Sequence, residues 1–343
     1  MKNDMKKSIL YLCVAALLAA ACAKAPVAGL NDASKRSFDA WIQVFYPNAV
    51  KTAPGYYVVE DQPGAGAVAG DESASPYVLV DYVIRTQDGT VKETVQEDLS
   101  KQIGTYDATY YYGPSVWARG AGQLNAGVDA ALNTMRVGGF KRFIVPGWLQ
   151  TNNRYDSEEE YLANVSGTST IYDVRLLELI PDIKKWETDS VGRYVSKTFP
   201  GKSVLDSLKY GFYYFRTKEP SSTIDFPADT TIYINYVGRL LNGLVFDTNI
   251  KDSAKYYGLY SATKTYTPST INWPSSDGTY SDIKMGSSTM IDGFSYALSK
   301  MHPHEKGVAV FYYDLGYGTS GSGNSIPPYA PLRFDIEIVN KPQ

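Results

Sequence analysis

Cysteine and histidine are scarce in this chain of 343 residues, which contains only two of each. The cysteines, Cys13 and Cys22, both lie in the N-terminal segment, so no disulfide framework can hold the rest of the chain. His302 and His304 flank Pro303 directly after a segment of helical spacing. They could serve a metal or act as a base, but we favour a pair of helix-end histidines, which the helix dipole stabilises. We therefore expect neither a metal nor a cofactor.

The chain also lacks an excess of charge of either sign. It has 33 Lys and Arg against 36 Asp and Glu, and the net charge of −3 gives no electrostatic basis for binding nucleic acid. With 44% apolar and 20% charged residues the composition is that of a folded protein, which excludes long disorder. The length suggests about two domains of roughly 150 residues each.

An apolar stretch does occur at the N-terminus, but it is too short for an ordinary membrane span. Residues 8–21 follow three lysines and form a segment of the kind that directs export. One interpretation is an ordinary secretory signal that is cleaved after Ala21 or at a small residue nearby. The other is a lipoprotein signal, because residues 17–22 (Leu-Leu-Ala-Ala-Ala-Cys) resemble the lipobox of bacterial lipoproteins. Leu18, however, lies four positions before Cys22 and not the usual three.

We favour the lipoprotein signal because it accounts for the cysteine usage. Cys13 would leave with the signal, residues 1–21, so Cys22 would be the first residue and the only cysteine of the mature chain. Two or more lipid chains on Cys22 would anchor the protein stably to a membrane, with residues 22–36 as a tether. The expected location is the cell envelope of a bacterium, either periplasmic or surface-exposed.

Tyrosine is unusually common, with 29 residues. Strands rich in Tyr explain this number most simply, because aromatic side chains suit a pleated, half-buried surface. A Tyr-lined surface that binds carbohydrate or peptide is the alternative.

The two halves of the chain repeat each other. The repeat is too long for a solenoid, so it predicts two tandem domains, at 37–182 and 183–343. A larger spacing between the last matches indicates extra residues in the second copy between Asp247 and Gly293. The matching segments are 55–59 with 211–215, 77–83 with 231–237, 88–89 with 242–243, 127–135 with 293–301 and 172–174 with 334–336.

Local patterns predict an antiparallel sheet with one short helix in each copy. Apolar residues alternate along 78–84, as in a strand. Asp88-Gly89 and Asn242-Gly243 are strong signals for hairpin turns. Residues 127–135 and 293–301 place apolar side chains at helical spacing. The expected fold class is therefore α+β.

Four fragments of the second copy place aromatic and apolar residues beside a few polar ones, as in a small binding pocket. They are Tyr236 with 243–247, then 290–294, then 315–318, and finally 326–328 with 334–337. In kind and in order they resemble the motifs of the FKBP family of peptidyl-prolyl cis-trans isomerases, over nearly all of 183–341. The resemblance implies two tandem FKBP-like domains, each an antiparallel β-sheet wrapped around a short α-helix.

The resemblance implies a catalytic role for five residues. Phe246 looks like a wall of a pocket for the prolyl ring, and Phe294 looks like its floor, where the best-known members have Trp. The backbone N–H of Ile291 and the hydroxyl of Tyr317 look like the donors that bind carbonyl groups of a substrate or ligand. Asp247 would make a polar contact at the edge of the pocket, although it could also be a turn residue.

Four more residues are implied to bind the substrate. Tyr236 and Phe334 look like further pocket walls, although both could be plain sheet core. Met290 is the neighbour of Ile291, and Ile326 matches the isoleucine of the loop over the pocket.

The second copy departs from the family at two places. Tyr312 and Tyr313 occupy the stretch where a proline normally precedes the Leu-Ala-Tyr-Gly motif, which reads Leu-Gly-Tyr-Gly at 315–318. The segment 251–282 is long and rich in Tyr, Ser and Thr. The family carries a further aromatic wall in this region, for which Tyr280 is the nearest candidate. These departures affect the expected substrate preference more than the pocket itself.

The first copy keeps the framework but not the pocket. Its replacements are Lys92-Glu93 for Phe246-Asp247, Asn125 for Ile291, Val128 for Phe294 and Thr151 for Tyr317. A lysine in the wall and the loss of the aromatic floor disfavour a dry prolyl site. We predict that this domain is not catalytic and that it binds partners or spaces the second domain from the membrane.

Three functions remain in competition. The leading one is a membrane-anchored prolyl isomerase, active in its second domain, that assists the folding of exported proteins. Its partners would be proline-containing peptides or unfolded exported chains. The second is a non-catalytic FKBP-like lipoprotein that binds peptides or proteins, and the third is a surface protein that binds glycans through Tyr-rich loops.

Overall fold

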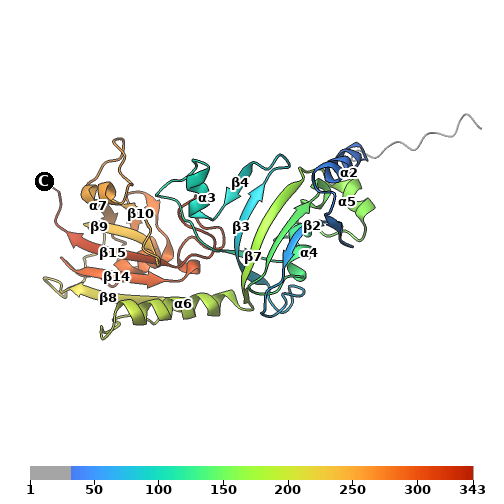
Figure 1. Cartoon of the computed structure of the whole chain (residues 1–343). Coiled ribbons are helices and arrows are strands. Elements are labelled where there is room, and N and C mark those ends of the chain that lie inside the picture. The colour runs from blue at the N-terminus through green and yellow to red at the C-terminus, as the bar shows by residue number, and fades with distance from the viewer. Residues whose placement is uncertain (1–31, 343) are drawn as a thin grey trace, which may run out of the picture.

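A computed structural model describes residues 32–342, which form two antiparallel sheets side by side (Figure 1). The signal segment 1–21, Cys13 and Cys22 lie outside the described residues, as does most of the tether. Lipidation therefore stays a prediction. Within residues 32–342, no helix is both long enough and apolar enough to cross a membrane.

The first sheet has seven strands in the order β1-β2-β6-β7-β3-β4, with β5 paired to β3. Helix α2 (Asp32–Phe45) precedes it and η1 (Gly147–Leu149) is a single 3-10 turn. The remaining elements are β1 (Val50–Lys51), β2 (Tyr57–Gln62), β3 (Tyr77–Arg85), β4 (Val91–Thr94), α3 (Glu97–Gln102), β5 (Ser115–Ala118), α4 (Ala126–Asn133), β6 (Phe140–Val145), α5 (Glu158–Asn164) and β7 (Thr170–Ile180).

The second sheet has eight strands in the order β13-β12-β11-β9-β15-β14-β8, with β10 paired to β9. Helix α6 (Ile183–Thr198) precedes it. The remaining elements are β8 (Phe212–Lys218), β9 (Thr231–Leu240), β10 (Val245–Thr248), α7 (Lys251–Tyr256), β11 (Ser269–Asn272), η2 (Tyr280–Asp282), β12 (Lys284–Met285), β13 (Ser288–Thr289), α8 (Asp292–Leu298), β14 (Lys306–Phe311), η3 (Tyr313–Leu315) and β15 (Leu332–Val339).

The two sheets share one topology, which confirms the predicted α+β tandem fold. The order β2-β6-β7-β3 in the first sheet corresponds to β8-β14-β15-β9 in the second. The predicted hairpins join β3 to β4 and β9 to β10, and Gly89 and Gly243 adopt the positive φ of 87° and 99° that such turns require. The segment 251–282 contributes α7 and, through β11, extends the edge of the second sheet beyond β9.

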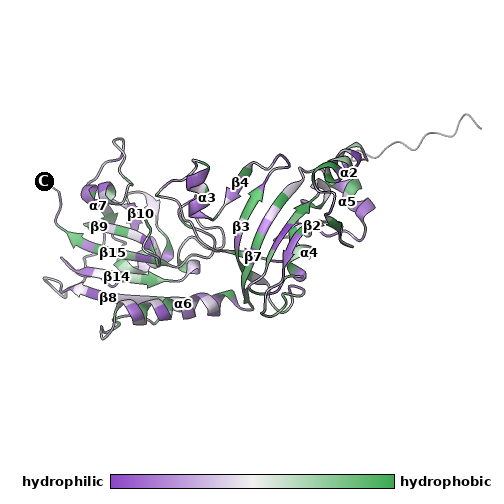
Figure 2. Ribbon diagram, viewed as in Figure 1, coloured by the Kyte–Doolittle hydropathy of each residue, from purple (hydrophilic) through white to green (hydrophobic). Residues whose placement is uncertain are grey.

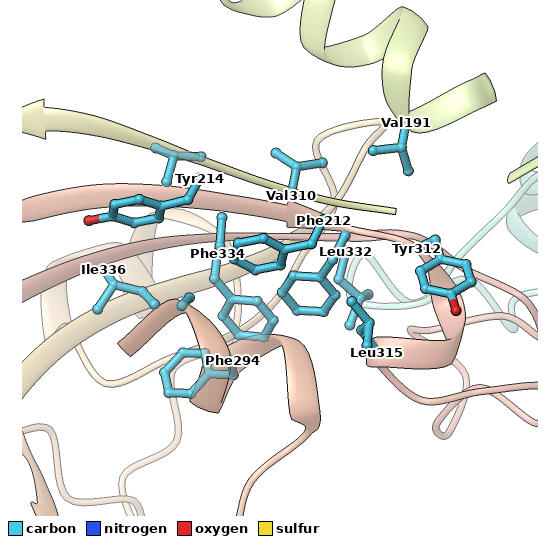
Figure 3. Packing of buried hydrophobic residues seen from close by; sticks show 14 of the residues in the cluster. Val191, Phe212, Tyr214, Phe294, Val310, Tyr312, Leu315, Leu332, Phe334 and Ile336 are labelled. Atoms are coloured by element: carbon cyan, nitrogen blue, oxygen red, sulfur yellow. The ribbon is translucent and has the colours of Figure 1, made fainter. Parts of the chain in front are cut away.

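Each sheet packs against its short helix through a glycine. A Cβ on Gly293 of α8 would lie 2.5 Å from the ring of Phe311, and one on Gly127 of α4 would lie 2.3 Å from Val145. These glycines let the helix approach the sheet closely. Figure 2 shows the apolar residues on the strands, and Figure 3 shows Phe294 of α8 against the ring of Phe334.

Helices α2 and α6 were not predicted from the sequence. Helix α6 begins after Asp182, whose carboxylate accepts the N–H of Lys185 at 3.0 Å as an N-cap. It lies along the second sheet (Figure 1) and buries a face with a period of four residues, made by Ile183, Glu187, Val191 and Val195. A glutamate within this face weakens the apolar pattern.

Candidate functional site

Four aromatic rings of the second domain meet on one side of its sheet, although they come from distant parts of the sequence. The rings of Phe294 and Phe334 lie 4.8 Å apart, and that of Tyr236 lies 5.6 Å from Phe294. These three side chains are buried. Phe246 is only half-buried, and its ring stands edge-on to Phe334 at 5.6 Å. The arrangement is an aromatic floor with one partly exposed wall.

Tyr317 and Ile326 come from the long connection between β14 and β15. The ring of Tyr317 is perpendicular to that of Phe246 at 6.4 Å and is 38% exposed, whereas Ile326 is buried. Among residues 32–342 the Tyr317 hydroxyl has no hydrogen-bond partner. Burial and the nearby charge of Asp247 raise the pKa of this hydroxyl, so it stays protonated and can donate.

Asp247 has both carboxylate oxygens engaged. The hydroxyl of Tyr236 donates to Oδ2 at 2.6 Å, and Lys264 Nζ lies 2.6 Å from Oδ1. Burial, and next the charge of Asp247, raise the pKa of Tyr236, which therefore remains a donor. The Asp247 carboxylate thus fixes the orientation of Tyr236, and each of its oxygens already accepts one hydrogen bond.

Ile291 is the N-cap residue of α8, with extended backbone angles and no side chain that could cap the helix. In the part of the chain that the structure describes, its own N–H donates no hydrogen bond. Its neighbour Met290 is half-buried. The equivalent residue of the first domain, Asn125, does cap its helix and accepts the N–H of Val128 at 2.9 Å. At this position the second domain has an apolar side chain and an unpaired backbone N–H, where the first domain has a side chain that caps the helix.

The structure brings six of the nine predicted residues into direct contact: the four rings, Tyr317 against Phe246, and Asp247 with Tyr236. The other three, Met290, Ile291 and Ile326, belong to or pack against the same apolar core. Their roles in catalysis and substrate binding stay predictions. Tyr280, the candidate for a further wall, packs its ring against Tyr296 at 5.2 Å and, among the described residues, makes no ring contact with the four aromatic residues of the cluster.

Two residues of the site were missed in the sequence. Lys264, in the long segment after α7, carries no pattern that would reveal its contact with Asp247. Gly238 lies inside β9, where a glycine often marks a close approach. A Cβ there would lie 2.6 Å from the ring of Phe246 and 2.7 Å from that of Phe334. This glycine therefore makes room for both rings.

In the first domain polar side chains occupy several of the corresponding positions. Tyr82 donates its hydroxyl to Glu93, as Tyr236 does to Asp247, which supports the alignment of the two copies. Tyr172 donates its hydroxyl to Gln150 at 3.1 Å, and the amide of Asn125 donates to the same Gln150 oxygen at 3.2 Å. A polar network thus replaces the apolar floor.

Comparison with known proteins identifies the family of the second domain. The family model of FKBP-type peptidyl-prolyl cis-trans isomerases matches residues 225–339. The second domain is an FKBP-type domain. The macrophage infectivity potentiator of Trypanosoma cruzi is 30% identical over 112 residues, which are 33% of this chain and 43% of that protein. FK506-binding protein 1 of Dictyostelium discoideum is 26% identical over 113 residues, which are 33% of this chain and 82% of that protein.

The crystal structure of the three FKBP domains of wheat FKBP73 aligns with 84% of this chain and covers 94% of its own, at 15% identity. Its TM-score of 0.29 is too low to support an argument about the arrangement of the domains. This chain spans less than half of the trypanosomal relative.

Proposed function

We propose that the FKBP-type domain at 183–343 catalyses the cis–trans isomerisation of bonds that precede proline. The barrier to rotation of a peptide bond is about 18–20 kcal/mol, because the bond has partial double-bond character. Isomers of these bonds therefore exchange over tens to hundreds of seconds. A catalyst needs no nucleophile or metal, because it only has to bind the twisted amide more tightly than the planar one.

One observation carries the proposal, namely an aromatic floor beside two unpaired donors. The prolyl ring would rest on Phe294 and Phe334, with Phe246 as a wall. The Tyr317 hydroxyl and the Ile291 N–H would hold carbonyl groups of the substrate in the twisted arrangement. A dry pocket favours the twisted amide, because it carries less charge separation than the planar form.

The wider role we propose is assistance in the folding of exported proteins. Its support is the N-terminal signal, with Cys22 as the site of a lipid anchor in a bacterial envelope. The substrates would be proline-containing peptides and unfolded exported chains. Mass spectrometry of the mature protein tests the anchor: a diacyl- or triacylglyceryl group on Cys22 supports it, and an unmodified chain that starts after a cleaved signal contradicts it.

Removing the Tyr317 hydroxyl tests the catalytic proposal. We expect the full chain to accelerate isomerisation of a short X-Pro peptide, and Tyr317→Phe to lower kcat/KM roughly three- to tenfold, the value of one hydrogen bond. Tyr256→Phe is the control, because Tyr256 lies on α7 and is 83% exposed. A wild-type rate no faster than the spontaneous one would contradict the proposal.

Filling the space at Gly238 tests the aromatic wall. In Gly238→Ala the new methyl group displaces the half-buried Phe246 ring, so we expect about a tenfold loss of kcat/KM and a loss of roughly 1–3 kcal/mol in the free energy of unfolding. Gly192→Ala on α6 is the control, because its Cβ would meet only the Tyr213 hydroxyl, at 3.8 Å. Full activity of Gly238→Ala would show that the Phe246 wall is not needed.

The second candidate is a non-catalytic module that binds peptides in the same pocket. It is motivated by Tyr312 and Tyr313 in place of the expected proline and by the long segment 251–282. Binding of a proline peptide by NMR without faster isomerisation would favour this candidate.

A further inference from the structure

The connection 316–331, which carries Tyr317 and Ile326, does not stand alone but rests against the first domain. The N–H of Tyr111 donates to the carbonyl of Asn324 at 2.8 Å. Pro327 and Pro328 line a cavity of about 320 Å³ together with residues of the first domain, among them Tyr82 and Glu93. These two are the counterparts of Tyr236 and Asp247. A loop of the second domain therefore lies at the edge of the first domain that corresponds to the proposed prolyl site of the second.

A row of three tyrosines in edge-on contact connects the first domain to the same loop. The ring of Tyr77, at the start of β3, stands edge-on to Tyr329 at 5.5 Å, and Tyr329 stands edge-on to Tyr313 at 5.1 Å. The N–H of Tyr329 donates to the carbonyl of Gly318 at 3.2 Å, and Gly318 follows Tyr317 directly. Tyr77 thus contacts Tyr329, and Tyr329 is hydrogen-bonded to the residue that follows Tyr317, the proposed catalytic residue.

The backbone of Tyr329 shows that this contact constrains the loop. Its φ is +58°, a left-handed conformation that is rare for a bulky residue and costs free energy. Such a conformation persists only where its surroundings enforce it. Tyr77 of the first domain and Tyr313 of the second both pack against the ring of Tyr329. Val116 of the first domain also belongs to the apolar core of the second.

We propose that the first domain positions the catalytic loop of the second, with Tyr77 as a positioning residue that acts through Tyr329. In this arrangement the framework of the first domain supports a loop of the second domain, although we predict no prolyl site in the first domain itself. The proposal deepens the proposed isomerase function, since the loop carries the donor Tyr317 and the pocket residue Ile326.

The test uses the full chain with Tyr77→Ala, which removes the ring from Tyr329. Hydrogen–deuterium exchange followed by mass spectrometry measures the loop directly, and we expect exchange in 316–331 to become roughly tenfold faster. We also expect kcat/KM for an X-Pro peptide to fall about three- to tenfold, because loosened donors lose their alignment with the substrate. Tyr77→Phe keeps the ring but removes the hydroxyl that interacts with the Tyr329 hydroxyl, so we expect a smaller effect than that of Tyr77→Ala.

Tyr155→Ala is the matched control. Tyr155 is also a half-buried tyrosine of the first domain, and it stands edge-on to Tyr161 at 5.0 Å. It should leave exchange in 316–331 and kcat/KM unchanged. Equal exchange of the loop in Tyr77→Ala, Tyr155→Ala and the wild type would overturn the proposal. Because exchange does not depend on catalysis, an inactive wild type would refute the isomerase function and still leave the docking of the loop measurable.

Discussion

Glu187→Gln is expected to stabilise the protein by about 2–4 kcal/mol at pH 9 and to change its stability little at pH 5. Glu187 lies on α6 at the junction of the two domains and is only 2% exposed. Among the described residues, its Oε2 atom has no hydrogen-bond partner. Burial raises the pKa of this carboxyl from 4.5 to about 8.

The direction of the effect follows from proton linkage. Between pH 4.5 and about 8 the folded state keeps a proton on Glu187 that the unfolded chain has released. The stability that depends on protonated Glu187 is therefore fully present below pH 4.5. It is lost progressively as the pH rises through the folded-state pKa. One pKa unit corresponds to about 1.4 kcal/mol, which makes roughly 4–5 kcal/mol the upper limit. Glutamine carries no charge at any pH, so it removes this loss.

Urea unfolding of the wild type and the variant at pH 5 and pH 9 measures the effect. Glu219→Gln is the control, because the Glu219 side chain is 82% exposed. It should leave the free energy of unfolding nearly unchanged at both pH values. Parallel pH profiles for the wild type and Glu187→Gln would show that the Glu187 carboxyl is not held protonated by burial.

Phe246→Ala is expected to lower kcat/KM for X-Pro peptides by about 10- to 100-fold. Burying an apolar group the size of a prolyl ring is worth roughly 1.5–3 kcal/mol, and each 1.4 kcal/mol is a factor of ten. Phe246 is half-buried and forms the exposed side of the ring cluster, so its removal opens the pocket to water while the buried floor remains. We therefore expect only a small loss of stability.

Phe226→Ala provides the matched control for Phe246→Ala. Phe226 is also half-buried, and within residues 32–342 its one ring partner is Trp273, at 5.0 Å and outside the ring cluster. It should lose a similar amount of stability and keep its activity. Equal losses of activity in the two variants would point to general destabilisation and away from a pocket wall.

Much of the fold follows from local signals that repeat in the sequence. The alternation along β3 and β9, the Asp-Gly and Asn-Gly turns and the glycine-led helices each depend on neighbouring residues, so they can be recognised without the structure. The ring cluster of Tyr236, Phe294 and Phe334 was accessible through the family resemblance. Both copies contain a tyrosine whose hydroxyl donates to a carboxylate, Tyr82 to Glu93 and Tyr236 to Asp247. This equivalence became clear only from the structure.

Other features depend on contacts between distant segments and leave no local pattern. Helix α6 buries a glutamate in its apolar face, which hides its period from the sequence. Lys264 reaches Asp247 from an irregular segment. The contact of Tyr77 with Tyr329 joins two domains, and each tyrosine alone fits an ordinary strand or loop. Tyr312 and Tyr313 depart from the family motif, and the ring of Tyr313 packs edge-on against Tyr329.

The most direct test of the central claim is exchange NMR of an X-Pro peptide with a catalytic amount of the full chain. This measurement records the interconversion of the two isomers itself and separates catalysis from binding. We expect exchange faster than the spontaneous rate with the wild type, and exchange at the spontaneous rate with the Phe246→Ala, Tyr317→Phe double variant. A wild-type protein that shifts the peptide resonances without accelerating their exchange would contradict it.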